Sequence, residues 1–127
     1  AAAAQTAKDA WTATGATLLE APQTPTGQID LPAALSLLAK QGLTRILCEG
    51  GSTLAAALIR VGLVDDLITY TAGAVIGAEG HPALGPLNLA ILAAAPRLSL
   101  RTTRRIGPDT ETHWSFPASP GPKYPEG

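Results

Sequence analysis

The sequence predicts an α/β fold: a mixed, mostly parallel sheet flanked by helices, with a C-terminal antiparallel hairpin. Helix-like and strand-like patterns alternate early in the chain, which is typical of α/β domains with right-handed crossovers. Two strand-like patterns then flank the turn signal Gly107-Pro108-Asp109, which predicts the hairpin. The chain has 127 residues, 46% hydrophobic and 4% aromatic, so it fits one domain with an aliphatic core.

The first expected elements precede residue 30. The alanine-rich residues 1–14 predict a helix that ends near Gly15. Residues 16–20 then predict a strand, with Thr17, Leu18 and Leu19 at its centre. Two prolines and a glycine within residues 22–28 predict a loop.

A leucine-rich helix is expected next, because Asp30 is a good N-cap and Pro32 falls in the first turn. Its apolar residues recur every three or four positions and form one stripe that would face a sheet: Leu31, Ala34, Leu35 and Leu38. Gly42 is expected to end this helix.

The apolar run Arg45–Glu49 predicts a buried strand of a parallel sheet. The single cysteine, Cys48, lies inside this run. We therefore expect a buried structural thiol rather than a nucleophile, and a lone cysteine excludes a disulfide framework.

The pair Gly50-Gly51 follows the strand directly and precedes a helix expected over residues 52–61. We expect the glycine backbone to take positive φ and to let another molecule come close. Ser52 or Thr53 is expected to cap the helix. The amides and the dipole at such a helix start suit an anion such as a phosphate, although the glycines could equally serve only a tight corner. The expected core stripe of this helix is Leu54, Ala57, Leu58 and Val61.

The second half of the chain reads as strands and loops. Residues 67–75 predict a strand, residues 77–86 a loop, and residues 91–95 a helical turn. Residues 98–106 alternate as a half-buried antiparallel strand does, and residues 110–116 predict the last strand. Residues 117–127, with four prolines, are expected to form a disordered tail after a domain that spans residues 1–116.

Composition restricts the functional classes. The formal net charge is −1 and there is no basic stripe, which argues against nucleic acid as a partner. No run has the length of a membrane span and no leader pattern is visible, so we expect a cytoplasmic location and no membrane partner. The chain contains no methionine, so we interpret it as a fragment of a larger protein.

No catalytic triad, carboxylate dyad or metal-ligand spacing is visible in the sequence. We expect His81 and His113 at the surface, and Asp65 and Asp66 in helix-terminal or solvent-facing roles, because neighbours in an extended chain point to opposite faces. Four arginines are expected on a solvated surface: Arg97, Arg101, Arg104 and Arg105.

Glu49 has two possible roles, and its residue type and position favour neither over the other. A carboxylate at the C-terminal end of a parallel strand lies where α/β sheets bind ligands, and it can accept hydrogen bonds from sugar hydroxyls. It could also cap the amides of the Gly50-Gly51 turn.

The segments Glu49–Ala55 and Gly62–Leu67 together resemble the reductase domain of the bacterial bifunctional riboflavin-biosynthesis deaminase-reductase. That family shows a strand ending in Val-Glu-Gly-Gly, a leucine-bearing helix, then Gly-Leu-Val-Asp-Glu-Leu. The resemblance covers roughly residues 10–116 and includes Gly85-Pro86-Leu87. The chain departs from the family at Ala72-Gly73, where Ala-Pro is usual, and at residues 77–80.

The resemblance implies a dihydrofolate-reductase-like fold, incomplete here, and hydride transfer from NADPH to 5-amino-6-(5-phosphoribosylamino)uracil. It favours Glu49 as a contact to this ribosylamino-pyrimidine phosphate. Exposed strands from Leu67 and Leu98 would suit a sheet-edge dimer, so we expect the intact parent protein to be a homodimer. No residue of the chain needs to donate a proton in that reaction. The implied cofactor-binding residues are Gly50, Gly51, Ser52, Thr53, Leu54, Ala55, Ala56 and Ala57.

Two other functions stay open. One is a stand-alone oxidoreductase of the same fold with another substrate. The other is a non-catalytic, truncated module that serves dimerisation.

Overall fold

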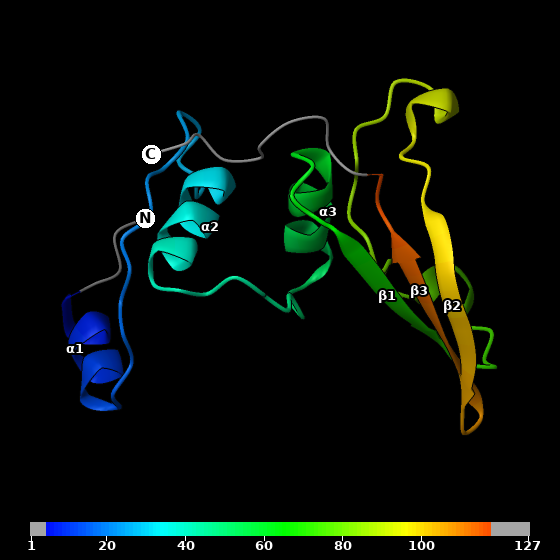
Figure 1. The fold of residues 1–127 in the computed structure, drawn as a ribbon, viewed down its shortest axis with the longest axis horizontal. Helices are drawn as coiled ribbons and strands as arrows, with labels where there is room; N and C mark the ends of the chain where they lie inside the picture. The colour runs from blue at the N-terminus through cyan, green and yellow to red at the C-terminus, as the bar shows by residue number, and fades with distance from the viewer. Residues whose placement is uncertain (1–4, 118–127) are drawn as a thin grey trace. The chain divides into compact units, whose positions relative to one another are not determined.

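The computed structural model describes residues 5–117. Within them lie three α-helices: α1 (Gln5–Ala13), α2 (Leu31–Lys40) and α3 (Ser52–Arg60). The strands of this part are β1 (Asp66–Thr71), β2 (Ser99–Ile106) and β3 (Asp109–Ser115) (Figure 1). Short 3₁₀ turns η1 and η2 occupy Gly77–Glu79 and Leu92–Ala94. The chain divides into two compact units, Ala1–Leu47 and Cys48–Gly127.

The first unit contains the two helices that the sequence predicted there. Gly15 takes a φ of +84° just after α1, as expected of a residue that ends a helix. The Asp30 carboxylate accepts a hydrogen bond of 3.0 Å from the Ala33 amide and caps α2. Pro32 lies in the first turn of α2, and Gly42, also at +84°, follows its end. The predicted start and end of α2 are therefore confirmed.

The second unit contains the sheet, whose order is β1-β3-β2. Both pairings are antiparallel, and Asp66 faces Ser115 while Ile106 faces Asp109. The C-terminal hairpin is confirmed, since β2 and β3 are joined at Gly107, which has a φ of +59°. The predicted parallel arrangement is not observed among residues 5–117.

The two strands expected in the first half of the chain are not formed. Residues 16–20 have no strand partner in the described chain, and Leu18 and Leu19 are more than a third exposed. Residues 45–49 are exposed throughout and cross the boundary between the two units. An apolar run becomes a strand only where a neighbouring strand pairs with it, and neither segment has one in residues 5–117.

Strand β2 differs from its expected half-buried state, because all eight of its residues are exposed. It lies at the edge of the sheet and carries a bulge between Leu100 and Thr102. Leu100 pairs with Trp114 and Thr102 with its neighbour His113, so Arg101 is the extra residue.

Few apolar side chains are buried. Among the described apolar residues only Ala56 and Ile59, both on α3, are buried. The buried face of this helix therefore differs from the expected one, because Leu54 and Val61 are 40% and 50% exposed. Strand β3 is the better covered strand of the sheet, with Glu111 and Ser115 buried.

Candidate functional site

The start of α3 forms the candidate site. Its N-cap is Gly51, which is extended (φ −63°, ψ 169°) and offers no side-chain cap. The expectation that Ser52 or Thr53 caps the helix is wrong, since both lie inside its first turn. The first helical bond runs from the Ala55 amide to the Gly51 carbonyl, 3.1 Å away. The amides before Ala55 therefore face outward from an N-cap without a side chain, ready for an acceptor from elsewhere.

The two glycines of the turn do not use positive φ, which corrects a second expectation. A Cβ added at Gly50 would lie 2.7 Å from Leu54 Cδ2, so a side chain there would require the exposed Leu54 side chain to move. A Cβ added at Gly51 would meet no heavy atom within 4 Å. Open space thus adjoins the helix start at Gly51, and a phosphate group fits such a place.

The residues that the sequence predicted for this site differ in their exposure to solvent. Gly50, Gly51, Thr53 and Leu54 are exposed, whereas Ser52, Ala55 and Ala57 are half-buried. Ala56 is 2% exposed, so its side chain packs inward instead of facing a ligand. The accessible part of the site is therefore the turn itself and the first helical residues.

Glu49 is exposed, directly before the turn. Its neighbour Cys48 is exposed as well, so the expectation of a buried thiol is wrong. The reason is the same as for the missing strand: without sheet neighbours, residues 45–49 are not covered. The pKa of the Tyr70 hydroxyl of β1 is raised mainly by Glu111 and, to a smaller degree, by the negative charge of Glu49.

Tyr70 belongs to a polar ladder that crosses the sheet. Glu111 on β3 faces Tyr70 on one side and Arg104 of β2 on the other. Arg104 binds Glu111 through two hydrogen bonds of 2.6 and 3.1 Å, and the carboxylate is buried although the guanidinium is exposed. The four arginines expected on a solvated surface, Arg97, Arg101, Arg104 and Arg105, are all exposed, and Arg104 in addition pairs with the buried carboxylate of Glu111.

The ladder shifts the protonation equilibria of its members. Hydrogen bonds from Arg104 and Tyr70 hold the pKa of Glu111 below its ordinary value. The same contact raises the pKa of the Tyr70 hydroxyl, because ionised Glu111 accepts its hydrogen bond and repels a phenolate.

We expect Glu111→Gln to lower the thermal unfolding midpoint by several degrees near neutral pH. Glu111 stabilises the fold above its ordinary pKa of about 4.3, and this contribution is lost as pH falls through its lowered pKa. The Tyr70 contribution is present below its ordinary pKa of about 10 and is lost as pH rises through the raised one. The difference from wild type should therefore shrink at both ends of a pH series of thermal melts.

The control is Glu79→Gln, which changes an exposed carboxylate outside the ladder. It should alter the midpoint little at any pH. A midpoint difference for Glu111→Gln that stays constant from acid to alkaline pH would contradict the role given to the ladder.

Other titratable side chains give structural contacts. His113 Nε2 lies 3.0 Å from Asp66 Oδ1, so this histidine pairs across β3 and β1 at the partly exposed surface. Arg101 Nε donates to the buried Ser115 hydroxyl at 2.9 Å. Residues 5–117 contain no cluster of three or more side chains suited to a metal ion.

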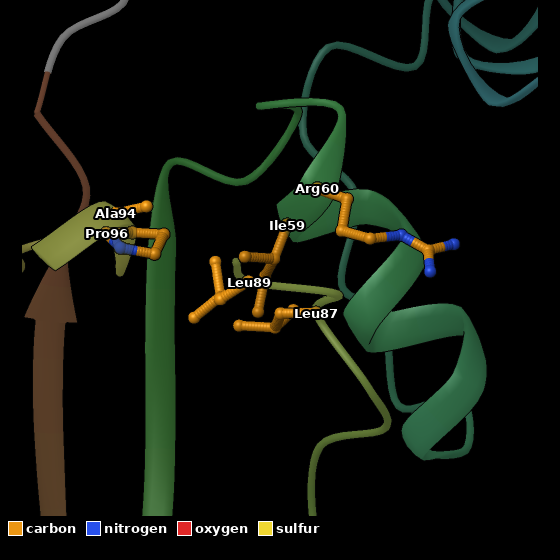
Figure 2. Close-up of a pocket in the computed structure, with 6 residues that line it drawn as sticks. All are labelled: Ile59, Arg60, Leu87, Leu89, Ala94 and Pro96. Atoms are coloured by element: carbon orange, nitrogen blue, oxygen red, sulfur yellow. The ribbon is translucent and has the colours of Figure 1, made fainter. Parts of the chain in front are cut away.

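A shallow hollow of about 350 Å³ lies at the opposite end of α3 (Figure 2). Its lining is apolar apart from Arg60, whose Nη1 lies 3.4 Å from the Pro86 carbonyl. Helical rise separates the first and last residues of α3 by about 12 Å, so the hollow is distinct from the glycine turn. It is lined by Ile59, Arg60, Leu87, Leu89, Ala94 and Pro96.

Gly85 has no predicted role in the sequence, although Gly85-Pro86 belongs to the family resemblance. The structure places Gly85 against the candidate site: its amide donates to the Ser52 carbonyl at 3.0 Å. In the sequence, Gly85 is marked only by the Gly85-Pro86 pair in a loop. Its position beside the Gly50-Gly51 turn arises from the fold.

No helix within residues 5–117 is both long enough and apolar enough to cross a membrane. Comparison with known proteins adds a family match: the family model described as RibD C-terminal domain matches residues 2–112. The riboflavin biosynthesis protein RibD of Escherichia coli (strain K12) is 38% identical over 87 residues, covering 68% of this chain and 24% of that protein. Its counterpart in Chlamydia pneumoniae is 29% identical over 93 residues, covering 73% of this chain and 24% of that protein.

A solved RibD structure has a similar fold. Acinetobacter baumannii RibD, form 2, aligns with a TM-score of 0.70 at 23% identity and covers 86% of this chain and 29% of that one. This likeness supports the dihydrofolate-reductase-like fold expected from the sequence. The chain spans about a quarter of the length of the curated relatives it matches.

Proposed function

Because the chain belongs to the RibD C-terminal domain family, we propose that it forms part of a reductase of riboflavin biosynthesis that uses NADPH. The substrate of this proposal is 5-amino-6-(5-phosphoribosylamino)uracil, whose ribosyl group becomes a ribityl group. NADPH, when bound, would supply the hydride. The work of this chain is to bind and orient, which agrees with a site that holds one carboxylate and several amides.

The observation that carries the proposal is the start of α3. An N-cap without a side chain leaves the first-turn amides available, and Gly51 borders open space. Backbone N–H groups and the positive end of the helix dipole favour the charge of a pyrophosphate. We assign the phosphates of NADPH to the amides of Gly51, Ser52 and Thr53.

Glu49 is the proposed contact to the ribosyl phosphate substrate. It is exposed and adjoins the turn, so a sugar hydroxyl could donate to its carboxylate while the cofactor occupies the helix start. We extend the proposal to a homodimeric parent protein, since β1 and β2 form the two edges of the described sheet and both are largely exposed.

We expect Gly51→Val to weaken NADPH binding about tenfold or more. Gly51 has φ −63°, a conformation that valine also adopts, so the effect comes from filling the open space and not from backbone strain. The measurement is the Kd of NADPH, followed by nicotinamide fluorescence on the longest natural polypeptide that carries this chain.

Gly73→Val is the matched control. Gly73 also has open space and lacks positive φ, but it lies beyond β1 and not at α3. This control should bind NADPH like wild type. Equal affinities for both variants would show that the cofactor does not use the start of α3.

A further inference from the structure

The segment that follows η1 runs along α3. At the first turn of the helix, the Gly85 amide donates to the Ser52 carbonyl at 3.0 Å. The long side chain of Arg60, a residue of the last turn, places its Nη1 3.4 Å from the Pro86 carbonyl. Leu87 and Leu89 then lie beside Ile59 in the apolar hollow (Figure 2). The segment therefore contacts the helix near both of its ends.

The contact at Gly85 leaves little room for a side chain. An added Cβ would lie 3.1 Å from the Ser52 carbonyl oxygen and 3.5 Å from Thr53 Cα. Both atoms are backbone, so they cannot rotate away as the end of a side chain could. Gly85 is not among the glycines with positive φ, so a larger residue is disfavoured here by close approach and not by backbone conformation.

These contacts fall on the residues whose amides the proposed function assigns to the cofactor phosphates. Resting on that function, we infer that Gly85 is a positioning residue for NADPH. It acts through the Ser52 carbonyl, to which its amide donates a hydrogen bond. Because Gly85 has no side chain, the loop can lie directly against the start of α3. A side chain here would displace Ser52 and Thr53 by a few tenths of an ångström, away from the place that the phosphates need.

The test compares Gly85→Ala and Gly85→Val with Gly73→Ala and Gly73→Val in the longest natural polypeptide that carries this chain. An alanine requires only a small shift, so that variant should fold; thermal melts check both. The first readout is the Kd of NADPH without substrate. The second is backbone amide hydrogen exchange in the first turn of α3, measured without NADPH. The third is the KM of the ribosyl phosphate substrate.

We expect the Kd of NADPH to rise about threefold for Gly85→Ala and about tenfold for Gly85→Val. Amide exchange at the start of α3 should quicken in both, while the KM of the ribosyl phosphate stays within about twofold of wild type. The Gly73 variants should change none of these. A merely structural role would lower the melting temperature without separating the affinity for NADPH from the KM of the substrate.

Two negative results are distinguishable. Wild-type protein that binds NADPH, with Gly85 variants that bind it equally well, would overturn this inference and leave the proposed function standing. Wild-type protein that binds no NADPH would overturn the proposed function, and the cofactor role of Gly85 with it, before any variant is compared.

Discussion

The chain of residues 1–127, purified alone, is expected to show no NADPH oxidation dependent on the ribosylamino-pyrimidine phosphate, and to associate. The physical reason is its uncovered apolar surface. Val75 and Leu92 are fully or nearly fully exposed, and only two apolar residues of the described chain are buried. Burying one such side chain contributes roughly 1.5–3 kcal/mol, so association offers a large stabilisation. The free edge of β2 adds a further place for another chain to pair.

Light scattering and a spectrophotometric assay of NADPH at one protein concentration provide the measurement. The longest natural polypeptide that carries the chain, assayed in parallel, is expected to show turnover. A monodisperse monomer of residues 1–127 that reduces the pyrimidine would refute the expectation. In that case the uncovered surface would be compatible with a complete site.

Glu49→Gln is expected to raise the KM of the ribosyl phosphate substrate about 10- to 150-fold, and the KM of NADPH much less. A hydrogen bond from a hydroxyl to a carboxylate contributes roughly 1.5–3 kcal/mol, which corresponds to that range. Glutamine keeps the shape of the side chain and removes the charge. Steady-state kinetics with each substrate varied in turn separates the two constants.

Glu79→Gln is the control for this prediction, because it neutralises another exposed carboxylate, on η1. It should leave both KM values near wild type. If Glu49→Gln instead weakens NADPH alone, Glu49 belongs to the cofactor or to the turn, and the assignment to the substrate is wrong.

The elements that the sequence predicted well depend on neighbours along the chain. Helix α2 is the clearest case, because its N-cap, its early proline and its closing glycine all act within a few residues. The hairpin of β2 and β3 likewise follows from a turn between two strand-like segments. Local signals suffice where the partner of each backbone group lies nearby in sequence.

The failures share a different cause. The strand expected over residues 45–49 needed a neighbouring strand, and an apolar pattern cannot indicate whether one is present. Burial of Cys48 and the burial stripe of α3 failed for the same reason, since both depend on what packs from afar. Within the candidate site, the sequence located the glycine turn but not the φ of Gly51 or the contact from Gly85.

The bulge in β2 has a consequence for comparing this chain with its relatives. Leu100 and Thr102 are two residues apart, yet their partners Trp114 and His113 are consecutive and point to opposite faces. The strand thus changes phase at Arg101, and one continuous period-2 pattern cannot describe it. A relative without the bulge would have one residue fewer here, so a correct alignment places a single gap at Arg101. Aligning the hairpin by its hydrophobic alternation alone would match residues of opposite faces along the rest of the strand.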